Sequence, residues 1–338
     1  MTYRIAINGF GRIGRNYLRR LAATDMANSG LRVVAINDLY DAATLAHLLE
    51  YDSTFGRIDA EVGHDDDQLL VGWHRIPTFA GRSPDTLPWG ELGVDLVIEA
   101  TGRLRSRDDA ALHLKAGAGR VLISAPGKNV DATLVPGVNA DSFDPDRHQV
   151  VSAASCTTNC VAPLVKVLHE AFGIEHGYLT TVHAYTNDQN VLDAPHKDPR
   201  RARAAGVNII PTSTGAAKAV GLVLPELAGR LDGVALRVPV VDGSISDLTL
   251  TLATEVPAAR INEVVATAAA GPMHGIIRYT EAPLVSADVI GDPASCVFDA
   301  RLTQAQGTTA KVFGWYDNEW GYTNRLVDLT MQMAATPS

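Results

Sequence analysis

Three closely spaced glycines near the N-terminus restrict the fold of this chain more than any other feature. They form the pattern Gly9-x-Gly11-x-x-Gly14, which follows a β-rich run at Arg4–Asn8 and opens a segment of helical composition, Gly14–Ala23. Glycines at this spacing allow a tight strand–turn–helix connection and let the backbone approach a pyrophosphate at the helix N-terminus. The pattern predicts a parallel βαβ unit that binds a dinucleotide. A close-packed turn without a ligand is the alternative.

An acidic residue supports the dinucleotide interpretation. Asp38 follows a second apolar run, Leu31–Ile36, and lies 24 residues after Gly14, close to the roughly 20 residues expected for the carboxylate that binds the ribose hydroxyls. A carboxylate at this position repels a 2′-phosphate, so NAD is favoured as the cofactor and NADP is disfavoured. The next residues, Leu39 and Tyr40, supply no arginine to attract that phosphate.

The order of predicted elements indicates an α/β protein of two domains, which suits a length of 338 residues. The first half alternates strands and helices, which is typical of a parallel sheet. The second half is rich in strands and suggests antiparallel pairing. We therefore expect an N-terminal Rossmann-type parallel sheet domain over 1–155 and an α+β catalytic domain with a mostly antiparallel sheet over 156–317. In the first half we predict strands at Leu96–Glu99 and Arg120–Ser124 with a helix at Asp108–Ala118 between them. In the second half the segments Val238–Leu252 and Lys311–Tyr316 are rich in strand, and long runs such as Leu179–Ala184 suggest the antiparallel pairing.

Composition excludes several classes of protein. The chain is 46% hydrophobic and 20% charged, which is typical of a globular protein with a substantial core. A net charge of −9 argues against nucleic acid as the primary partner. No apolar run reaches the roughly 18 residues of a membrane span, and no signal peptide is recognisable. Three cysteines suggest neither a disulfide scaffold nor a metal site, so we expect a reducing, cytoplasmic location.

A cysteine at a predicted helix start is the candidate nucleophile. The segment 155–160 follows an apolar strand at His148–Ala154 and opens a helix that ends near Ala171. At a helix N-terminus the amide groups and the dipole lower the pKa of a thiol, which would favour the thiolate of Cys156. Free cysteines are also often small core residues, and spacing does not decide between the two roles. Cys160, one helical turn later, is expected to be buried and inert.

A histidine is the candidate base. His183 ends a β-branched strand and is followed by polar residues up to Asp188. The chain has ten histidines, so a surface role is the alternative, and spacing does not show that His183 meets Cys156. The polar stretch Asn190–Gly206 contains proline and has little periodicity. A loop of this length is usually functional or part of an interface.

Six motifs, in order along essentially the whole chain, resemble the glyceraldehyde-3-phosphate dehydrogenase family of the common bacterial and eukaryotic type. They are INGFGRIGR at the N-terminus, SCTTNC around Cys156, HAYTNDQ at His183, PTSTGAAKAV around Thr214, RVPV at Arg237 and WYDNEWGY near the C-terminus. Six motifs in the same order are far more specific than any one of them.

The resemblance implies a reaction. Cys156 would attack the aldehyde of glyceraldehyde 3-phosphate, with His183 as its base. Hydride would pass to NAD, and inorganic phosphate would cleave the resulting thioester to release 1,3-bisphosphoglycerate. An erythrose-4-phosphate dehydrogenase, which shares the fold and the Cys/His pair, is the alternative within the same fold. A non-enzymatic NAD-binding regulator is the alternative from another class.

The resemblance also implies binding residues, a helix at 318–338 that packs back on the first domain, and a homotetramer with the 190–206 loop at a subunit interface. The substrate phosphate would be bound by Thr186 and Arg237, with Asp188 holding the arginine. Inorganic phosphate would be bound by Ser155, Thr157, Thr214 and Gly215, with Arg201 nearby. The cofactor would be bound by Gly9, Gly11, Arg12, Ile13, Gly14, Asp38, Arg82, Ser124 and Asn318. Ala194-Pro195 is intermediate between NAD-specific and dual-cofactor members, so some use of NADP stays open.

Overall fold

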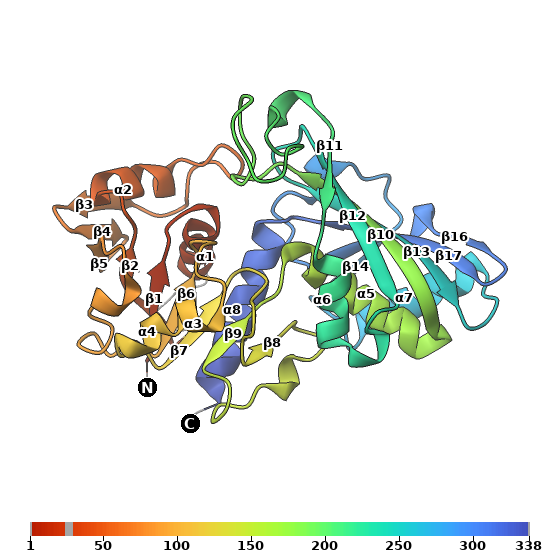
Figure 1. Cartoon of the computed structure of the whole chain (residues 1–338), viewed down its shortest axis with the longest axis horizontal. Helices are drawn as coiled ribbons and strands as arrows, with labels where there is room; N and C mark the ends of the chain where they lie inside the picture. The colour runs from red at the N-terminus through yellow and green to blue at the C-terminus, as the bar shows by residue number, and fades with distance from the viewer. Residues whose placement is uncertain (1, 24–29, 337–338) are drawn as a thin grey trace. The chain divides into compact units, whose positions relative to one another are not determined.

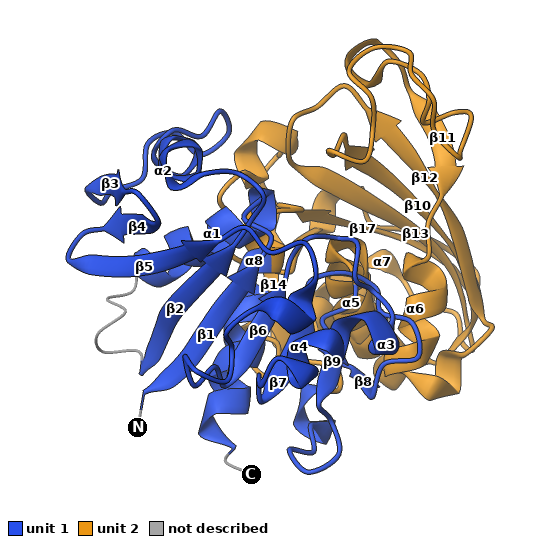
Figure 2. Ribbon diagram, turned by 60° about the vertical axis from the view of Figure 1, so that its left-hand side comes forward, with its two compact units in different colours: residues 1–134, 140–154, 323–338 blue, residues 135–139, 155–322 orange. Residues whose placement is uncertain are grey.

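A computed structural model describes residues 2–23 and 30–336, which form two compact units (Figure 2). Unit 1 contains residues 1–134, 140–154 and 323–338, and unit 2 contains residues 135–139 and 155–322. The predicted first domain and C-terminal helix include residues 1, 24–29 and 337–338, which lie outside the described residues. Residues 135–139, expected in the first domain, belong to unit 2.

Unit 1 is built on a sheet of nine strands, seven of which run parallel (Figure 1). This confirms the predicted Rossmann-type sheet. The parallel strands are buried on both faces and read as apolar runs, as expected for a sheet that helices cover. In sheet order the strands are β3 (Val62–Asp65), β4 (Gln68–Val71), β5 (His74–Phe79), β2 (Leu31–Asn37), β1 (Tyr3–Asn8), β6 (Leu96–Glu99), β7 (Arg120–Ile123), β9 (Val150–Ser152) and β8 (Ala132–Thr133).

Short helices connect these strands. They are α1 (Arg12–Ala22), α2 (Ala42–Glu50), α3 (Arg107–Ala110) and α4 (Leu112–Lys115). The segment Asp108–Ala118 is helical as predicted, but it is divided into α3 and α4 and its helix ends at Lys115. Gly117 adopts a φ of +96° there, which ends the helix because only glycine takes this conformation readily.

Unit 2 is built on a mostly antiparallel sheet, as predicted. On β13 buried residues alternate with partly buried ones, which places every second side chain against the core. In sheet order the strands are β11 (Ile210–Ser213), β12 (Leu231–Val238), β10 (Ile174–Ala184), β13 (Ser244–Leu252), β17 (Thr309–Tyr316), β15 (Cys296–Asp299) and β14 (Ile277–Thr280), and β16 (Gln304–Gln306) pairs with β17. The long helix α5 (Cys156–Phe172) contacts α6 (Ala216–Val223), α7 (Ala258–Ala270) and the strands β13, β15 and β17.

The segment Val238–Leu252, expected to be rich in strand, contains the last residue of β12 and the whole of β13. β12 ends at Val238 and β13 begins at Ser244. Pro239 cannot donate to a sheet ladder, and Gly243 has a φ of +83°. These two residues enforce a turn between the strands. Between Asn190 and Ala204 the chain forms no helix or strand, in agreement with the expected loop.

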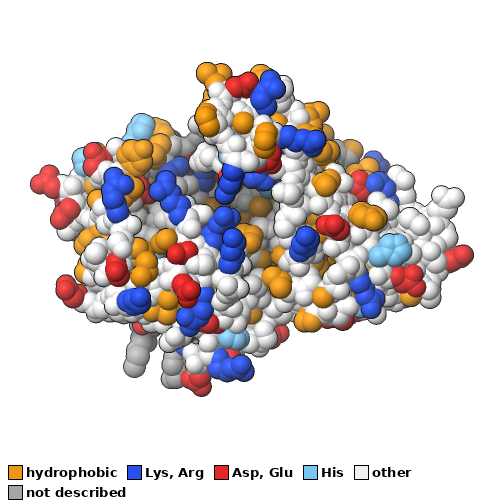
Figure 3. All heavy atoms as spheres, viewed as in Figure 1, with side chains coloured by type: hydrophobic (Ala, Val, Ile, Leu, Met, Phe, Trp, Pro, Cys, Tyr) orange, Lys and Arg blue, Asp and Glu red, His pale blue; other side chains and the backbone are white. Residues whose placement is uncertain are grey.

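Helix α8 (Trp320–Ala335) begins in unit 2 and ends in unit 1. Its C-terminal part is held to α1, because the hydroxyl of Tyr17 donates to Thr330 Oγ1 at 2.9 Å. No helix among the described residues is long and apolar enough to cross a membrane. Acidic and basic side chains are both spread over the face shown in Figure 3.

The turn before α1 offers a test of the glycine pattern. A Cβ atom added to Gly14 would overlap the carbonyl oxygen of Gly9 and lie 3.1 Å from Ile7 Cγ2, whereas one added to Gly11 would meet no atom within 4 Å. We expect Gly14→Ala to lower the free energy of unfolding by about 1–3 kcal/mol, as overpacking does. Gly11→Ala, the matched control, should cost less than about 1 kcal/mol. Urea unfolding followed by circular dichroism measures both, and equal losses would contradict this account of Gly14.

Candidate active site

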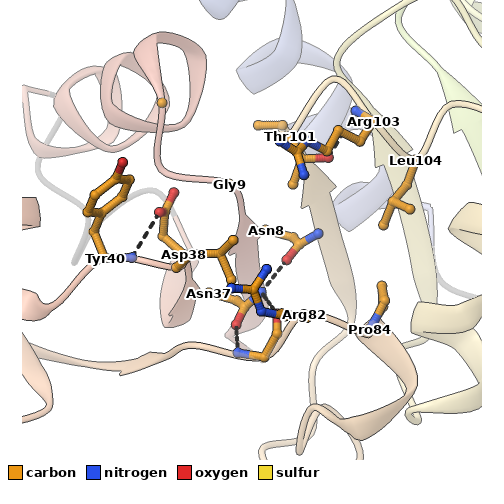
Figure 4. Close-up of a pocket in the computed structure, with 14 residues that line it drawn as sticks. Asn8, Gly9, Asn37, Asp38, Tyr40, Arg82, Pro84, Thr101, Arg103 and Leu104 are labelled. Carbon is orange, nitrogen blue, oxygen red and sulfur yellow. Dashed lines mark hydrogen bonds between the residues drawn. The ribbon is translucent and has the colours of Figure 1, made fainter.

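The carboxyl ends of β1 and β2 border a cavity of about 340 Å³ in unit 1 (Figure 4). Gly9 lines it with a φ of +91°, and a Cβ atom there would lie 2.7 Å from the amide nitrogen of Thr101. Only glycine therefore fits the turn, and no side chain at this position separates the backbone from the cavity. A cavity at this edge of a parallel sheet, beside a helix N-terminus, fits a dinucleotide.

Four of the predicted cofactor residues line this cavity, namely Gly9, Gly11, Asp38 and Arg82. The carboxylate of Asp38 accepts a hydrogen bond from the amide of Phe10 at 2.7 Å, so the glycine turn itself fixes its position. The other predicted residues lie outside the lining. Arg12, Ile13 and Gly14 belong to α1, where Arg12 pairs with Asp52, and Ser124 donates to the carbonyl oxygen of Glu99 at 3.0 Å.

Unit 2 brings the two candidate catalytic side chains together. Cys156 is the first residue of α5, and the hydroxyl of the N-cap Ser155 accepts a hydrogen bond from the amide of Thr158. His183 lies near the end of β10. The Sγ atom of Cys156 is 3.4 Å from Nε2 of His183, a distance at which a proton can pass between them.

The imidazole of His183 is held from its other side. β10 and β12 pair in parallel with His183 opposite Arg237. Nδ1 of the ring lies 2.7 Å from the carbonyl oxygen of Ala184 and 2.9 Å from Nη1 of Arg237, and Nη1 also donates to the Ala184 carbonyl at 3.0 Å. A carbonyl oxygen can only accept, so the 2.7 Å contact with Ala184 assigns the proton to Nδ1. Arg237, which can only donate, then bonds the same carbonyl and not Nδ1. The lone pair of Nε2 then faces the sulfur.

Burial and the charge of Arg237 lower the pKa of His183 to about 3. The side chain is 4% exposed, so desolvation disfavours the imidazolium. At neutral pH the ring is uncharged and can accept a proton, which is the state that a general base requires.

The pKa of the Cys156 thiol departs from expectation. The helix start is confirmed, but burial raises this pKa, and the charge of Arg237 and the hydrogen bonds of Thr157 only partly oppose the effect. The prediction of a depressed pKa was wrong because it considered the helix terminus without the desolvation of the sulfur. A neutral thiol beside a neutral imidazole follows, and the thiol needs a base when it reacts.

Two residues predicted to bind phosphate have other partners. Asp188, expected to hold Arg237, instead forms an ion pair with Arg201, whose Nε atom donates to Thr212 Oγ1 at 2.9 Å. This correction follows from the loop between β10 and β11, which folds Arg201 back over Asp188. The hydroxyl of Thr157 is buried and lies 2.9 Å from the hydroxyl of Tyr316.

The remaining predicted residues of unit 2 lie at the ends of elements. Thr214 accepts a hydrogen bond from the amide of Ala216, and Gly215 is the N-cap of α6. The amide of Thr186 donates to Gln189 Oε1 at 3.3 Å. Asn318, between β17 and α8, accepts a 2.6 Å hydrogen bond from the hydroxyl of Ser244 through Oδ1.

Sequence reasoning missed three residues around this site. Tyr316 joins Thr157 to Thr181 through its hydroxyl, at 2.9 and 2.8 Å, and packs edge-to-face on His183. Ser244 accepts from the amide of Ala184 and donates to Asn318. Asp317 accepts from the amides of Glu319 and Trp320 and so caps α8. Tyr316 and Asp317 lie in the WYDNEWGY motif, so the sequence could have indicated a role for them. Ser244 lies in none of the six motifs.

A Rossmann-type unit and a thiol beside a neutral imidazole are the components of an NAD-linked oxidoreductase that acts on aldehydes through a cysteine. Comparison with known families agrees. Residues 3–107 match the family model "Glyceraldehyde 3-phosphate dehydrogenase, NAD binding domain", and residues 155–318 match that of the C-terminal domain. The chain belongs to the glyceraldehyde-3-phosphate dehydrogenase family.

Individual relatives are similar over almost the whole chain. Glyceraldehyde-3-phosphate dehydrogenase 1 of Streptomyces avermitilis is 58% identical over 99% of this chain and 100% of its own length. The glyceraldehyde-3-phosphate dehydrogenase of Streptomyces coelicolor is 57% identical over 98% of both chains, and that of Geobacillus stearothermophilus is 55% identical over 99% of both.

The lowered pKa of His183 predicts how stability depends on pH. Histidine in an unfolded chain titrates near about 6.5, and the folded-state value is about 3. Between these two values the unfolded state binds the proton and the folded state does not, so the free energy of unfolding falls as the pH falls through this window. We expect the urea midpoint of the wild type to decrease more steeply from pH 7 to pH 4 than that of His183→Asn. Parallel curves would exclude a buried neutral His183.

Proposed function

We propose that this protein converts D-glyceraldehyde 3-phosphate, inorganic phosphate and NAD to 1,3-bisphosphoglycerate and NADH, as the names of its relatives suggest. The observation that carries the proposal is the 3.4 Å contact between Cys156 Sγ and His183 Nε2 at the start of α5. A thiol with a raised pKa beside an uncharged base is a nucleophile that becomes active only when its proton is taken.

In the proposed first step, the sulfur of Cys156 bonds to the aldehyde carbon while its proton passes to Nε2 of His183. The carbonyl oxygen becomes the hemithioacetal oxygen, beside the imidazolium and the amide groups at the start of α5, which stabilise negative charge there. NAD, when bound, would supply the hydride acceptor for oxidation of the hemithioacetal to a thioester. An oxygen of inorganic phosphate then attacks the thioester carbon, and the sulfur leaves with the bonding electron pair. The sulfur takes its proton back from Nε2 of His183, and the proton of the phosphate passes to solvent.

Two groups of residues would bind the phosphates. Arg237 presents its guanidinium beside the imidazole, and we assign the substrate phosphate to it together with Thr186, with Asp188 acting through Arg201 rather than on Arg237 directly. Inorganic phosphate is assigned to the N-terminal ends of α5 and α6, where Ser155 and Gly215 are the N-cap residues. The hydroxyls of Thr157 and Thr214 lie at the same helix ends, with Arg201 nearby.

Unit 1 would bind the cofactor. The bare backbone at Gly9 and the cavity that Asp38 and Arg82 line support this assignment, and the charge of Asp38 favours NAD over NADP. Arg12, Ile13, Gly14 and Ser124 are assigned to the cofactor by resemblance, as is Asn318 to the nicotinamide amide.

We also propose a homotetramer in the cytoplasm. The loop after β10 and the residues next to it expose large apolar side chains, with Val191 85%, Leu192 76%, Val207 79% and Ile209 68% exposed. Exposed apolar residues in one segment are typical of an interaction surface, which supports the subunit interface that the resemblance implies.

The substrate separates this proposal from erythrose-4-phosphate oxidation. Purified protein should oxidise glyceraldehyde 3-phosphate with NAD, and the rate should depend on inorganic phosphate. A larger kcat/KM for erythrose 4-phosphate, or a rate that is independent of phosphate, would favour the alternative dehydrogenase. Absence of turnover with either aldehyde would favour a regulator.

The catalytic pair can be tested with matched cysteine variants. Cys156→Ala should abolish turnover, whereas Cys160→Ala, in the same helix and fully buried, should keep most of it. His183→Asn should lower kcat about 10²- to 10⁴-fold, the usual share of a general base. Steady-state rates with a melting control measure these effects. Turnover retained by Cys156→Ala would place the nucleophile elsewhere.

The choice of cofactor can be tested at Asp38. Asp38→Asn removes the charge but keeps an oxygen that can accept the hydrogen bond from the amide of Phe10, so the glycine turn should persist. We expect kcat/KM with NADP to rise about tenfold or more, equivalent to about 1.4 kcal/mol of repulsion removed. Initial rates with both cofactors measure the change. A variant that still rejects NADP as strongly as the wild type would show that another group sets the preference.

A further inference from the structure

A chain of buried polar side chains runs from the lining of the cavity of unit 1, at Asn8 and Asn37, to residues outside the lining, Glu99, His113 and Trp89. Asn8 is 2% exposed, Asn37 6%, Glu99 1% and His113 0%. These residues come from the carboxyl ends of β1, β2 and β6 and from α4. Burying polar groups costs free energy unless every one has a hydrogen-bond partner. A buried polar chain in a parallel sheet therefore suggests a specific role.

The hydrogen bonds of His113 with Trp89 and Glu99 fix the position of its ring proton. The indole nitrogen of Trp89 donates to Nδ1 of His113 at 2.9 Å, so the ring proton must lie on Nε2. Nε2 is 3.1 Å from Glu99 Oε2 and donates to it. Trp89 therefore selects the histidine tautomer that Glu99 can use.

The second half of the network converges on the same carboxylate. Nδ2 of Asn8 donates to Glu99 Oε2 at 2.5 Å, and Nδ2 of Asn37 donates to Asn8 Oδ1 at 2.7 Å. Asn37 is also joined to Gly81 in both directions, because it accepts from the Gly81 amide at 2.8 Å and donates to the Gly81 carbonyl at 2.9 Å. Figure 4 shows Asn8 and Asn37 at the cavity and the hydrogen bond that joins them.

The other oxygen of the Glu99 carboxylate is bonded to a different segment of the cavity wall. Glu99 Oε1 accepts from the amide of Thr101 at 2.9 Å and from its hydroxyl, and Thr101 lines the cavity. Asn8, Asn37 and Gly81 line the cavity themselves, together with the residues that follow them, Gly9, Asp38 and Arg82. One buried carboxylate thus connects the four segments that form the cavity.

We propose that the network Trp89–His113–Glu99–Asn8–Asn37 is a positioning device for the cofactor. It holds the glycine turn, Asp38, Arg82 and Thr101 at fixed separations, so that the adenosine–pyrophosphate half of the dinucleotide meets a preformed site. None of its atoms needs to take part in the reaction. The inference rests on the proposed binding of NAD by unit 1. Preorganisation of this kind strengthens binding because the side chains and loops of the site lose less conformational freedom when the ligand binds.

Glu99→Gln tests the centre of the network. The amide keeps the size of the side chain but turns an NH₂ group toward donors, so the walls should shift. Hydrogen bonds to a buried charge are lost, so we expect Kd for NAD and for ADP-ribose to rise about tenfold or more. At saturating NAD, kcat and KM for the aldehyde should stay within about twofold. Titration calorimetry and initial rates on the full-length protein measure these values.

A pair of variants at His113 keeps the test decisive if Glu99→Gln does not fold. In His113→Gln the amide nitrogen of the new side chain reaches the place of the ring Nε2 and can still donate to Glu99, whereas the side chain in His113→Leu cannot. We expect His113→Leu to weaken ADP-ribose binding about tenfold and His113→Gln to stay within about threefold of the wild type. Equal affinities of these two variants would overturn the proposal.

A control separates positioning from general loss of stability. Tyr17→Phe removes one buried hydrogen bond of unit 1, the 2.9 Å contact with Thr330, and Tyr17 does not line the cavity. Its Kd for ADP-ribose should match that of the wild type even if its melting temperature falls. If Tyr17→Phe weakens ADP-ribose binding as much as His113→Leu does, the network has only a structural role. A wild type that binds neither NAD nor ADP-ribose would instead overturn the proposed function and this inference with it.

Discussion

The chemistry proposed for unit 2 depends on keeping one imidazole uncharged beside a thiol. Strand register achieves this, because parallel pairing of β10 with β12 sets Arg237 opposite His183. Burial, which is the larger cause, and this guanidinium together lower the pKa of His183 to about 3. A shift of β12 by one residue would turn Arg237 to the other face of the sheet. The register of two strands therefore determines the protonation state of the base.

The two units use buried polar groups in the same way, although their chemistry differs. In unit 2 the hydroxyl of Tyr316 joins Thr157 of α5 to Thr181 of β10, which ties the helix of the nucleophile to the strand of the base. In unit 1 the carboxylate of Glu99 joins three strand ends at the cavity. Fully satisfied polar networks cost little stability but permit few alternative arrangements. Both therefore act as rigid supports for groups that have to keep their positions.

Much of the fold could be predicted from the sequence, because its signals are local. The glycine pattern and the apolar runs indicated β1, β2, β6 and β7, and the motif around Cys156 indicated the start of α5. The contact between Cys156 and His183 could not be derived from spacing, since it depends on how α5 packs on the sheet. The pKa of Cys156 and the partner of Asp188 were predicted wrongly for the same reason. Desolvation and the course of the loop around Arg201 are properties of the packed structure.

Arg237 links substrate binding to proton transfer in the proposed mechanism. Its charge is one of the two main causes of the lowered pKa of His183, and the same guanidinium is assigned to the substrate phosphate. A phosphate dianion beside Arg237 offsets that charge, so the pKa of His183 rises when the substrate binds. The imidazole then becomes a stronger base at the moment when Cys156 has to give up its proton. An uncharged aldehyde of the same size would leave Arg237 unneutralised and His183 a weak base, so substrate selection and nucleophile activation have a common physical origin.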